Sequence, residues 1–185
     1  MNSFIKYQDL EINQECKKKL ECLYYQIKEH KFDLLGSGNV KIDYDLKPKG
    51  FCGKKYNTAK MNDYGKLVQT LFFKGNEQYK PINWFIDYKS GFFYNPIFFH
   101  NRKRCIGTIE NKKGVDIKTV WELGRMYHLV SLASYACVTD GSTQKDIVKE
   151  FYYEILDFIK TNPIGHTVQW SAPMDVSIRI VNILV

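Results

Sequence analysis

The sequence predicts a mainly helical fold of antiparallel helix hairpins with an irregular, aromatic-rich segment on its N-terminal side. Three observations predict it. Apolar residues recur at helical spacing over most of residues 117–184, whereas only residues 40–46 alternate with the period of a strand. The chain has 185 residues, of which 44% are hydrophobic and 15% aromatic, so it can bury a sizeable core and is not a disordered chain. We therefore expect one helical domain over residues 1–185.

The N-terminal half is expected to contain one helix, one extended segment and long irregular stretches. The helix carries apolar residues on one face at i, i+4, i+7 and i+11, namely Cys16, Leu20, Leu23 and Ile27, and should end near Phe32. Residues 47–66 are polar, contain proline and glycine, and are expected to form a loop. Residues 79–99 are dense in aromatic side chains without a clean period, which indicates an irregular segment laid over a helical core.

The C-terminal half is expected to form three helices. Asp116 can cap the first, over residues 117–138, whose core stripe comprises Val120, Leu123, Tyr127, Val130, Ala133 and Cys137. The second should span residues 144–160, because the residue before Pro163 avoids the helical region. Ser171 can cap the third, with Pro173 in its first turn.

This third helix is apolar on nearly every side. Its polar residues form one narrow stripe of Asp175, Arg179 and Asn182. A helix of this kind belongs inside a larger helical assembly, and the apolar pattern continues to Val185. We therefore expect the chain to be an N-terminal piece of a longer helical protein, and we expect it to self-associate through this helix.

Charge and cysteine content exclude little. The 27 basic and 20 acidic residues give a net charge of +7, but the surplus is scattered and forms no basic arm, so nucleic acid is not the expected partner. The five cysteines have no paired spacing, and we expect neither a metal site nor a cofactor. The opening residues lack an export signal and no stretch is long enough to span a membrane, so the chain is expected to be cytoplasmic.

Two groups of side chains are candidates for substrate binding. Trp121, Arg125 and His128 share one face of the expected helix 117–138, where aromatic and cationic groups together suit an acidic sugar. The second group, His166, Gln169 and Trp170, lies on a loop between two helices, where binding residues are often found. The structural alternative is a helix–helix contact in which Trp121 is buried and Arg125 is paired with an acidic residue.

Residues 82–185 resemble the N-terminal helical part of the heparinase II/III-like family of bacterial polysaccharide lyases. One matching motif is an aspartate and a lysine before a Trp-Glu-Leu-x-Arg helix, here Asp116, Lys118 and residues 121–125. The following pattern has an Asn-Pro, a glycine, a tryptophan, an acidic residue and an arginine, here Asn162, Pro163, Gly165, Trp170, Asp175 and Arg179. Two departures are Gly124, where serine is common, and Asp175, where glutamate is usual.

The resemblance implies part of an (α/α) toroid and a partner that is an acidic, uronic-acid-containing polysaccharide. Similar proteins cleave such glycans by β-elimination and are often periplasmic or secreted. Their proton-transfer residues lie beyond the position equivalent to Val185, so no catalytic residue is carried over to this chain. The expected role is therefore a wall of the substrate cleft. The alternative is a non-catalytic module for acidic-glycan binding or assembly.

Overall fold

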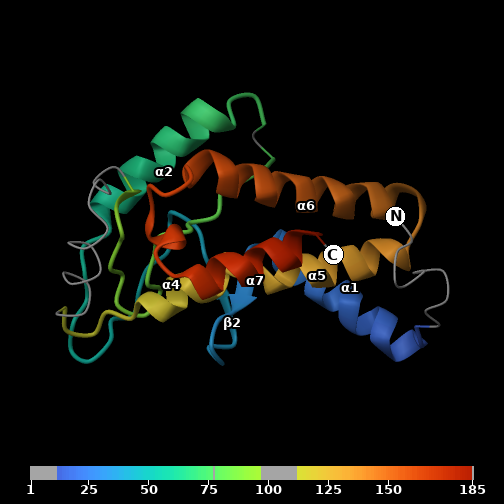
Figure 1. Ribbon diagram of the computed structural model, residues 1–185, viewed down its shortest axis with the longest axis horizontal. Coiled ribbons are helices and arrows are strands. Elements are labelled where there is room, and N and C mark those ends of the chain that lie inside the picture. Colours follow the sequence, from blue (N-terminus) through green and yellow to red (C-terminus); the bar gives the residue numbers. More distant parts are fainter. Residues whose placement is uncertain (1–11, 77, 97–111, 185) are drawn as a thin grey trace.

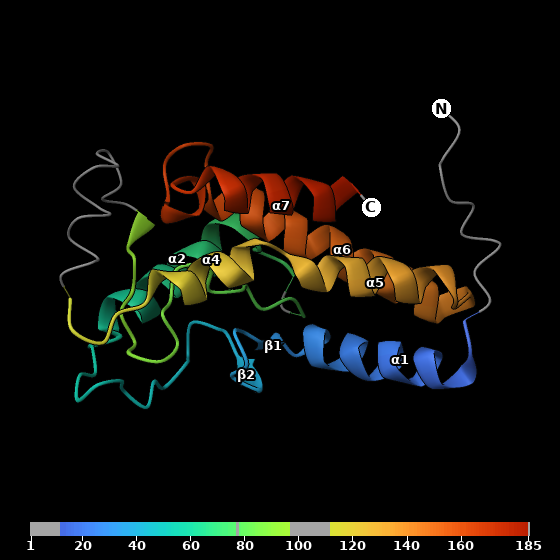
Figure 2. The same ribbon diagram turned by 60° about the horizontal axis from the view of Figure 1, so that its bottom comes forward.

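The computed structural model describes residues 12–76, 78–96 and 112–184 and confirms the expected mainly helical fold (Figure 1). The N-terminal half contains, in chain order, helix α1 (Gln14–Lys28), strands β1 (Lys31–Asp33) and β2 (Asn39–Lys41), and helix α2 (Ala59–Phe72). The C-terminal half contains helices α4 (Ile117–Gly124), α5 (Tyr127–Cys137) and α6 (Gly141–Thr161), the 3-10 helix η3 (Val168–Trp170) and helix α7 (Pro173–Leu184). Figure 2 shows α1 on one side of α5, with α6 and α7 on the other.

The α1 helix ends earlier than its apolar spacing predicts. The Asn13 side chain caps its start by accepting a hydrogen bond from the Cys16 amide at 2.8 Å. His30 then adopts a left-handed backbone conformation with φ of 53°, and the chain turns into the short antiparallel pair β1–β2. The strand-like alternation of residues 40–46 thus yields regular pairing only at its beginning, where Val40 lies opposite Phe32.

Helix α2 lies partly within the residues expected to form a loop, 47–66. Its sequence carries Gly65, which disfavours a helix and suggested a break. The structure uses this glycine for close packing, because a Cβ at residue 65 would lie 2.4 Å from the Cβ and Cγ of Tyr44. Tertiary contact therefore outweighs the low intrinsic propensity.

The single helix expected over residues 117–138 is two helices. Met126 takes a left-handed conformation with φ of 60° and separates α4 from α5. The break changes which side chains face the core, so the expected stripe is wrong beyond Leu123. Tyr127 and Cys137 are exposed, whereas the buried residues are Val120, Leu123, Met126, Leu129, Leu132 and Tyr135.

The aromatic segment is part of the core and does not lie over it. Ile82, Trp84 and Phe85 are fully buried, and an isolated bridge joins Ile86 to Phe93. Buried Asp87 ties the segment to the start of α4, because its carboxylate accepts hydrogen bonds from the Asp116 amide at 3.1 Å and the Thr119 hydroxyl at 3.2 Å. Residues 97–99 of the expected segment lie outside the described residues.

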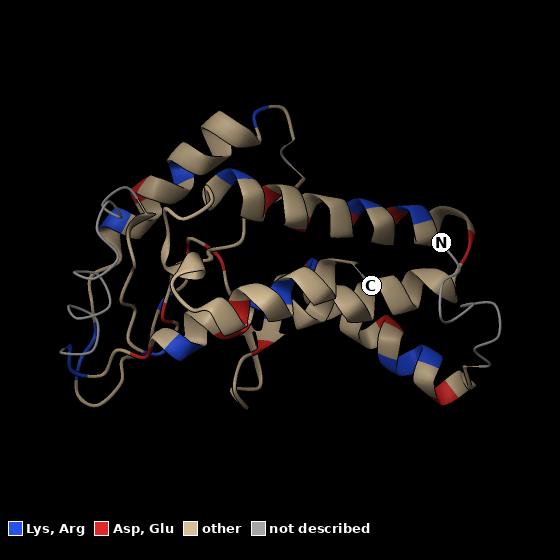
Figure 3. Cartoon of the chain, in the orientation of Figure 1, with Lys and Arg blue, Asp and Glu red and all other residues tan. Residues whose placement is uncertain are grey.

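Helix α7 buries its polar stripe and exposes much of its apolar surface. Asp175, Arg179 and Asn182 are the buried residues of the helix. The exposed apolar residues are Met174 at 63%, Ile180 at 52%, Val181 at 59% and Leu184 at 79%. Among the described residues, no helix combines the length and the apolar character that crossing a membrane requires. Charged residues are spread over nearly all elements (Figure 3).

Candidate functional site

Arg125 follows the last turn of α4 and joins that helix to α7 through two ion pairs. Its Nη1 lies 2.5 Å from Glu122 Oε2, and its Nε lies 2.6 Å from Asp175 Oδ1. Burial opposes the charge on Arg125, but the hydrogen bond to Asp175 and the charges of Asp175 and Glu122 outweigh it and raise its pKa. The guanidinium therefore serves as a connection between two helices, as in the structural alternative.

Gln169 is fully buried at the centre of the same region. Its Nε2 donates hydrogen bonds to the carbonyl oxygens of Trp84 at 2.7 Å and Val120 at 3.1 Å. Arg179 completes the connection, donating from Nε to the Gly124 carbonyl at 2.5 Å and from Nη2 to the Gln169 carbonyl at 2.9 Å. A glycan cannot reach Gln169 in this conformation, because no part of its side chain is accessible.

We call Glu122, Arg125, Gln169, Asp175 and Arg179 the motif network. Burial lowers the pKa of Arg179 to about 10, with Asp175 acting in the opposite direction, so the guanidinium stays charged at neutral pH. The guanidinium carbon of Arg179 lies 4.3 Å from the centre of the Phe158 ring. Through ion pairs and hydrogen bonds to backbone carbonyls, the network therefore holds η3 and α7 against α4.

The two predicted tryptophans border this network and are half-buried. Trp121 Nε1 donates to the Val168 carbonyl at 3.0 Å, and Trp170 Nε1 donates to the Asn162 carbonyl at 3.1 Å. Both indole N–H groups therefore hold the loop between α6 and α7. Both residues are nevertheless partly exposed.

The structure separates the two predicted histidines from this group. His128 lies on α5, beyond the break at Met126, and its Nε2 is 2.6 Å from Glu154 Oε2 on α6. His166 is exposed on the loop that precedes η3. Of the six predicted binding residues, Trp121, Arg125, Gln169 and Trp170 therefore converge, whereas His128 and His166 do not.

A second group of polar side chains lies between α6 and the residues that follow α1. Metal-ligating atoms of His30, Glu150 and Glu154 all lie within 4.8 Å of one another. Within the described residues, His30 Nε2, Glu150 Oε1 and Glu154 Oε1 are buried atoms that make no hydrogen bond. We call these three residues the His30 cluster. One imidazole and two carboxylates are groups that could hold a divalent cation.

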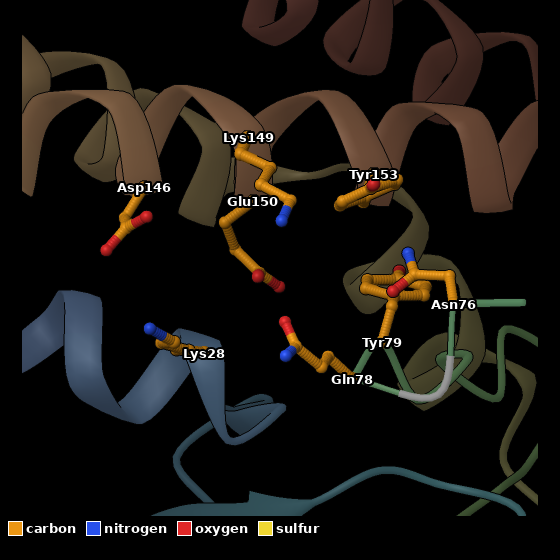
Figure 4. A pocket seen from close by; sticks show the side chains of 8 residues that line it. All are labelled: Lys28, Asn76, Gln78, Tyr79, Asp146, Lys149, Glu150 and Tyr153. Carbon is orange, nitrogen blue, oxygen red and sulfur yellow. The ribbon is translucent and has the colours of Figure 1, made fainter. Parts of the chain in front are cut away.

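The cluster borders two pockets that share residues. Glu150 lines both, and His30 lines the larger one, which has a volume of about 420 Å³. Figure 4 shows the Glu150 side chain extending from α6 toward Lys28 on α1 and Gln78 on the connecting segment. The site is therefore reachable from the surface on the Glu150 side.

The sequence carries a signal for this cluster that is not a local motif. Glu150, Glu154 and Asp157 occupy positions i, i+4 and i+7 of α6, on the face that also buries Ile147 and Phe158. The predicted face of this helix comprised Ile147, Phe151, Ile155 and Phe158, but Phe151 and Ile155 are only half-buried. The acidic residues were overlooked because carboxylates rarely lie in a core, and His30 is distant in the sequence.

No family model, no curated protein and no solved structure matches this chain.

Proposed function

We propose that the chain forms part of an (α/α) toroid in a protein that acts on uronic-acid-containing polysaccharides, as its resemblance to the heparinase II/III-like family implies. The observation that carries the proposal is the convergence of the motif residues. Arg125 of one motif bonds to Asp175 of the other, fifty positions later in the sequence, and Arg179 of the second motif donates to the carbonyl of Gly124 in the first. Residues of the two motifs that lie far apart in the sequence therefore meet in the fold, which supports the proposal.

In this proposal the motif network is the framework of the substrate cleft, and contact with the glycan falls to side chains at its border. Trp121 and Trp170 are partly exposed at this border, and His166, which lies outside the network, is exposed on the loop that precedes η3. Aromatic faces stack on sugar rings, while donors on a loop bind hydroxyl or carboxylate groups. The chain is not proposed to supply the groups that abstract the proton in β-elimination.

Binding to a panel of heparan sulfate, alginate, a neutral glycan and duplex DNA at two salt concentrations tests the proposal. We expect the chain to bind at least one uronate polymer in preference to the neutral glycan and DNA. We also expect no unsaturated product, which absorbs near 235 nm. Turnover by the chain itself, or equal binding of DNA, would contradict the proposal.

The loop offers a matched pair of variants. His166→Ala should weaken uronate binding about tenfold, which corresponds to the loss of one charge-assisted hydrogen bond. Ile164→Ala changes a side chain that is 82% exposed on the same loop and should leave the affinity unchanged. Equal affinity of both variants and the parent chain would remove His166 from the glycan site.

A further inference from the structure

The interior face of α6 carries three acidic residues. Glu154 and Asp157 are fully buried, and the Glu150 side chain is 12% exposed. Two imidazoles, those of His30 and His128, face these carboxylates, and Lys28 and Lys149 line the pocket beside Glu150. Buried carboxylates are stable only when they are paired, protonated or bound to a metal ion.

Three of these groups are of types that ligate zinc and lie close enough together to share one ion. His30 Nε2 lies 3.4 Å from Glu150 Oε1, yet the two atoms make no hydrogen bond. Ligands about 2.0–2.2 Å from a tetrahedral ion lie about 3.3–3.6 Å from one another, so this separation suits a shared Zn²⁺. A Glu154 carboxylate oxygen lies within 4.8 Å of both, and one turn of α6 separates the two glutamates.

The surroundings hold these ligands in place. The second oxygen of Glu154 is 2.6 Å from His128 Nε2, an arrangement that orients a metal-binding carboxylate. The His30 ring packs against the rings of Phe32, at 6.4 Å between centres, and Tyr79, at 5.5 Å. His30 also occupies the position after α1 where glycine is usual, with φ of 53°, so the chain keeps an imidazole at a strained position.

We propose that His30, Glu150 and Glu154 bind one zinc ion, with the fourth coordination position directed toward the pocket that His30 and Glu150 line. Three protein ligands and one open position are the pattern of zinc sites that bind water or an exogenous ligand. The site lies apart from the motif network, and it stands whether or not the chain binds a glycan.

Zinc titration of the full chain, monitored by competition with a chromophoric chelator, tests the proposal. The cysteines are alkylated first, because four of them are exposed and thiolates bind zinc. We expect one zinc ion per alkylated chain. His30→Asn, which keeps a residue tolerant of positive φ, and Glu154→Gln should each weaken zinc binding at least about 10–100-fold. Asp146→Asn, one turn before Glu150 on the same helix, should leave the affinity unchanged.

Circular dichroism on each variant separates loss of a ligand from loss of the fold. If Glu154→Gln does not fold, Glu150→Gln takes its place, because that side chain reaches the pocket and tolerates change more easily. Unchanged zinc affinity in folded His30 and glutamate variants would overturn the proposal. Absence of zinc binding after alkylation, or binding of Mg²⁺ in preference to Zn²⁺, would overturn it as well.

Discussion

The amide of Gln169 occupies the space in which a side chain at residue 124 would begin. A Cβ on Gly124 would lie 1.9 Å from Gln169 Oε1 and 2.7 Å from its Cδ. Gln169 is held there by its bonds to the carbonyls of Trp84 and Val120. The glycine that departs from the resembling family's common serine therefore makes room for a buried amide.

Gly124→Ala is expected to destabilise the protein by about 1–3 kcal/mol, the usual cost of overpacking a core. Urea unfolding followed by circular dichroism measures the effect. The double variant Gly124→Ala, Gln169→Ala should lose less than the sum of the two single variants, because removing the amide removes the clash. Additive losses would show that the two residues do not share this space.

Arg125→Ala is expected to lower stability strongly, because it removes the direct ion-pair partner of the Asp175 carboxylate, a residue only 1% exposed. Breaking a buried ion pair costs about 3–5 kcal/mol, and the partial exposure of Arg125 places the loss toward the lower end. Lys118→Ala, an exposed change on the same helix, is the control. If Arg125→Ala instead left stability unchanged and weakened uronate binding tenfold, Arg125 would belong to the glycan site.

Self-association is expected through the exposed apolar side of α7. Ile180→Glu combined with Leu184→Glu should shift the chain toward the monomer in sedimentation velocity at high concentration, because both side chains are more than half exposed. Ile164→Glu, in an exposed loop, should leave the association state unchanged. A monomeric parent chain at high concentration, with no binding of a dye for apolar surface, would contradict the expectation.

Stability is expected to fall as the pH rises through neutrality because of Asp157. Burial raises its pKa from 3.8 to about 7, against the hydrogen bonds from the Ile82 amide and the Tyr79 hydroxyl. The folded state therefore keeps a proton that the unfolded state releases. The stabilising contribution is complete below about pH 4 and is lost as the pH rises through about 7.

Asp157→Asn tests the direction of this pH dependence, because the amide oxygen can still accept both hydrogen bonds while the group no longer titrates. Thermal melts in the presence of a chelator should show the variant more stable than the parent near pH 8, by a few kcal/mol at most, and similar to it near pH 4. A parent chain whose stability rises over this interval, with an unchanged slope in the variant, would contradict the assignment.

Local patterns predicted helices in the C-terminal half, the cap at Asp116 and a start near Pro173. The predicted cap at Ser171 is wrong, because α7 begins after Ala172 and the Ser171 hydroxyl donates to the Val168 carbonyl. They failed where long-range packing decides the backbone. Met126 takes the left-handed conformation that separates α4 from α5, where the one local signal of a helix end is Gly124. Gly65 lies within α2 because it packs against Tyr44. The sequence of α2 alone does not contain Tyr44, so it cannot show why a glycine is favourable at residue 65.

In the candidate site, too, local patterns predicted some positions, and long-range packing determined the others. Helical spacing placed Trp121 and Arg125 together correctly, since both precede the break, whereas His128 follows it and faces Glu154. The convergence of Gln169 and Trp170 with them depends on how α7 docks, which spacing does not specify. The His30 cluster was missed because it joins α6 to a residue about 120 positions earlier in the chain.

The buried polar stripe of α7 also sets how that helix can be oriented. Rotating it about its own axis by one residue, about 100°, would bring apolar residues inward at little hydrophobic cost. It would also leave the Arg179 and Asn182 donors without the Gly124 and Arg125 carbonyls that they now reach. Each buried donor left unpaired costs about 1–3 kcal/mol. The polar stripe therefore fixes a single rotational setting, which the surrounding leucine, isoleucine and valine side chains would not distinguish.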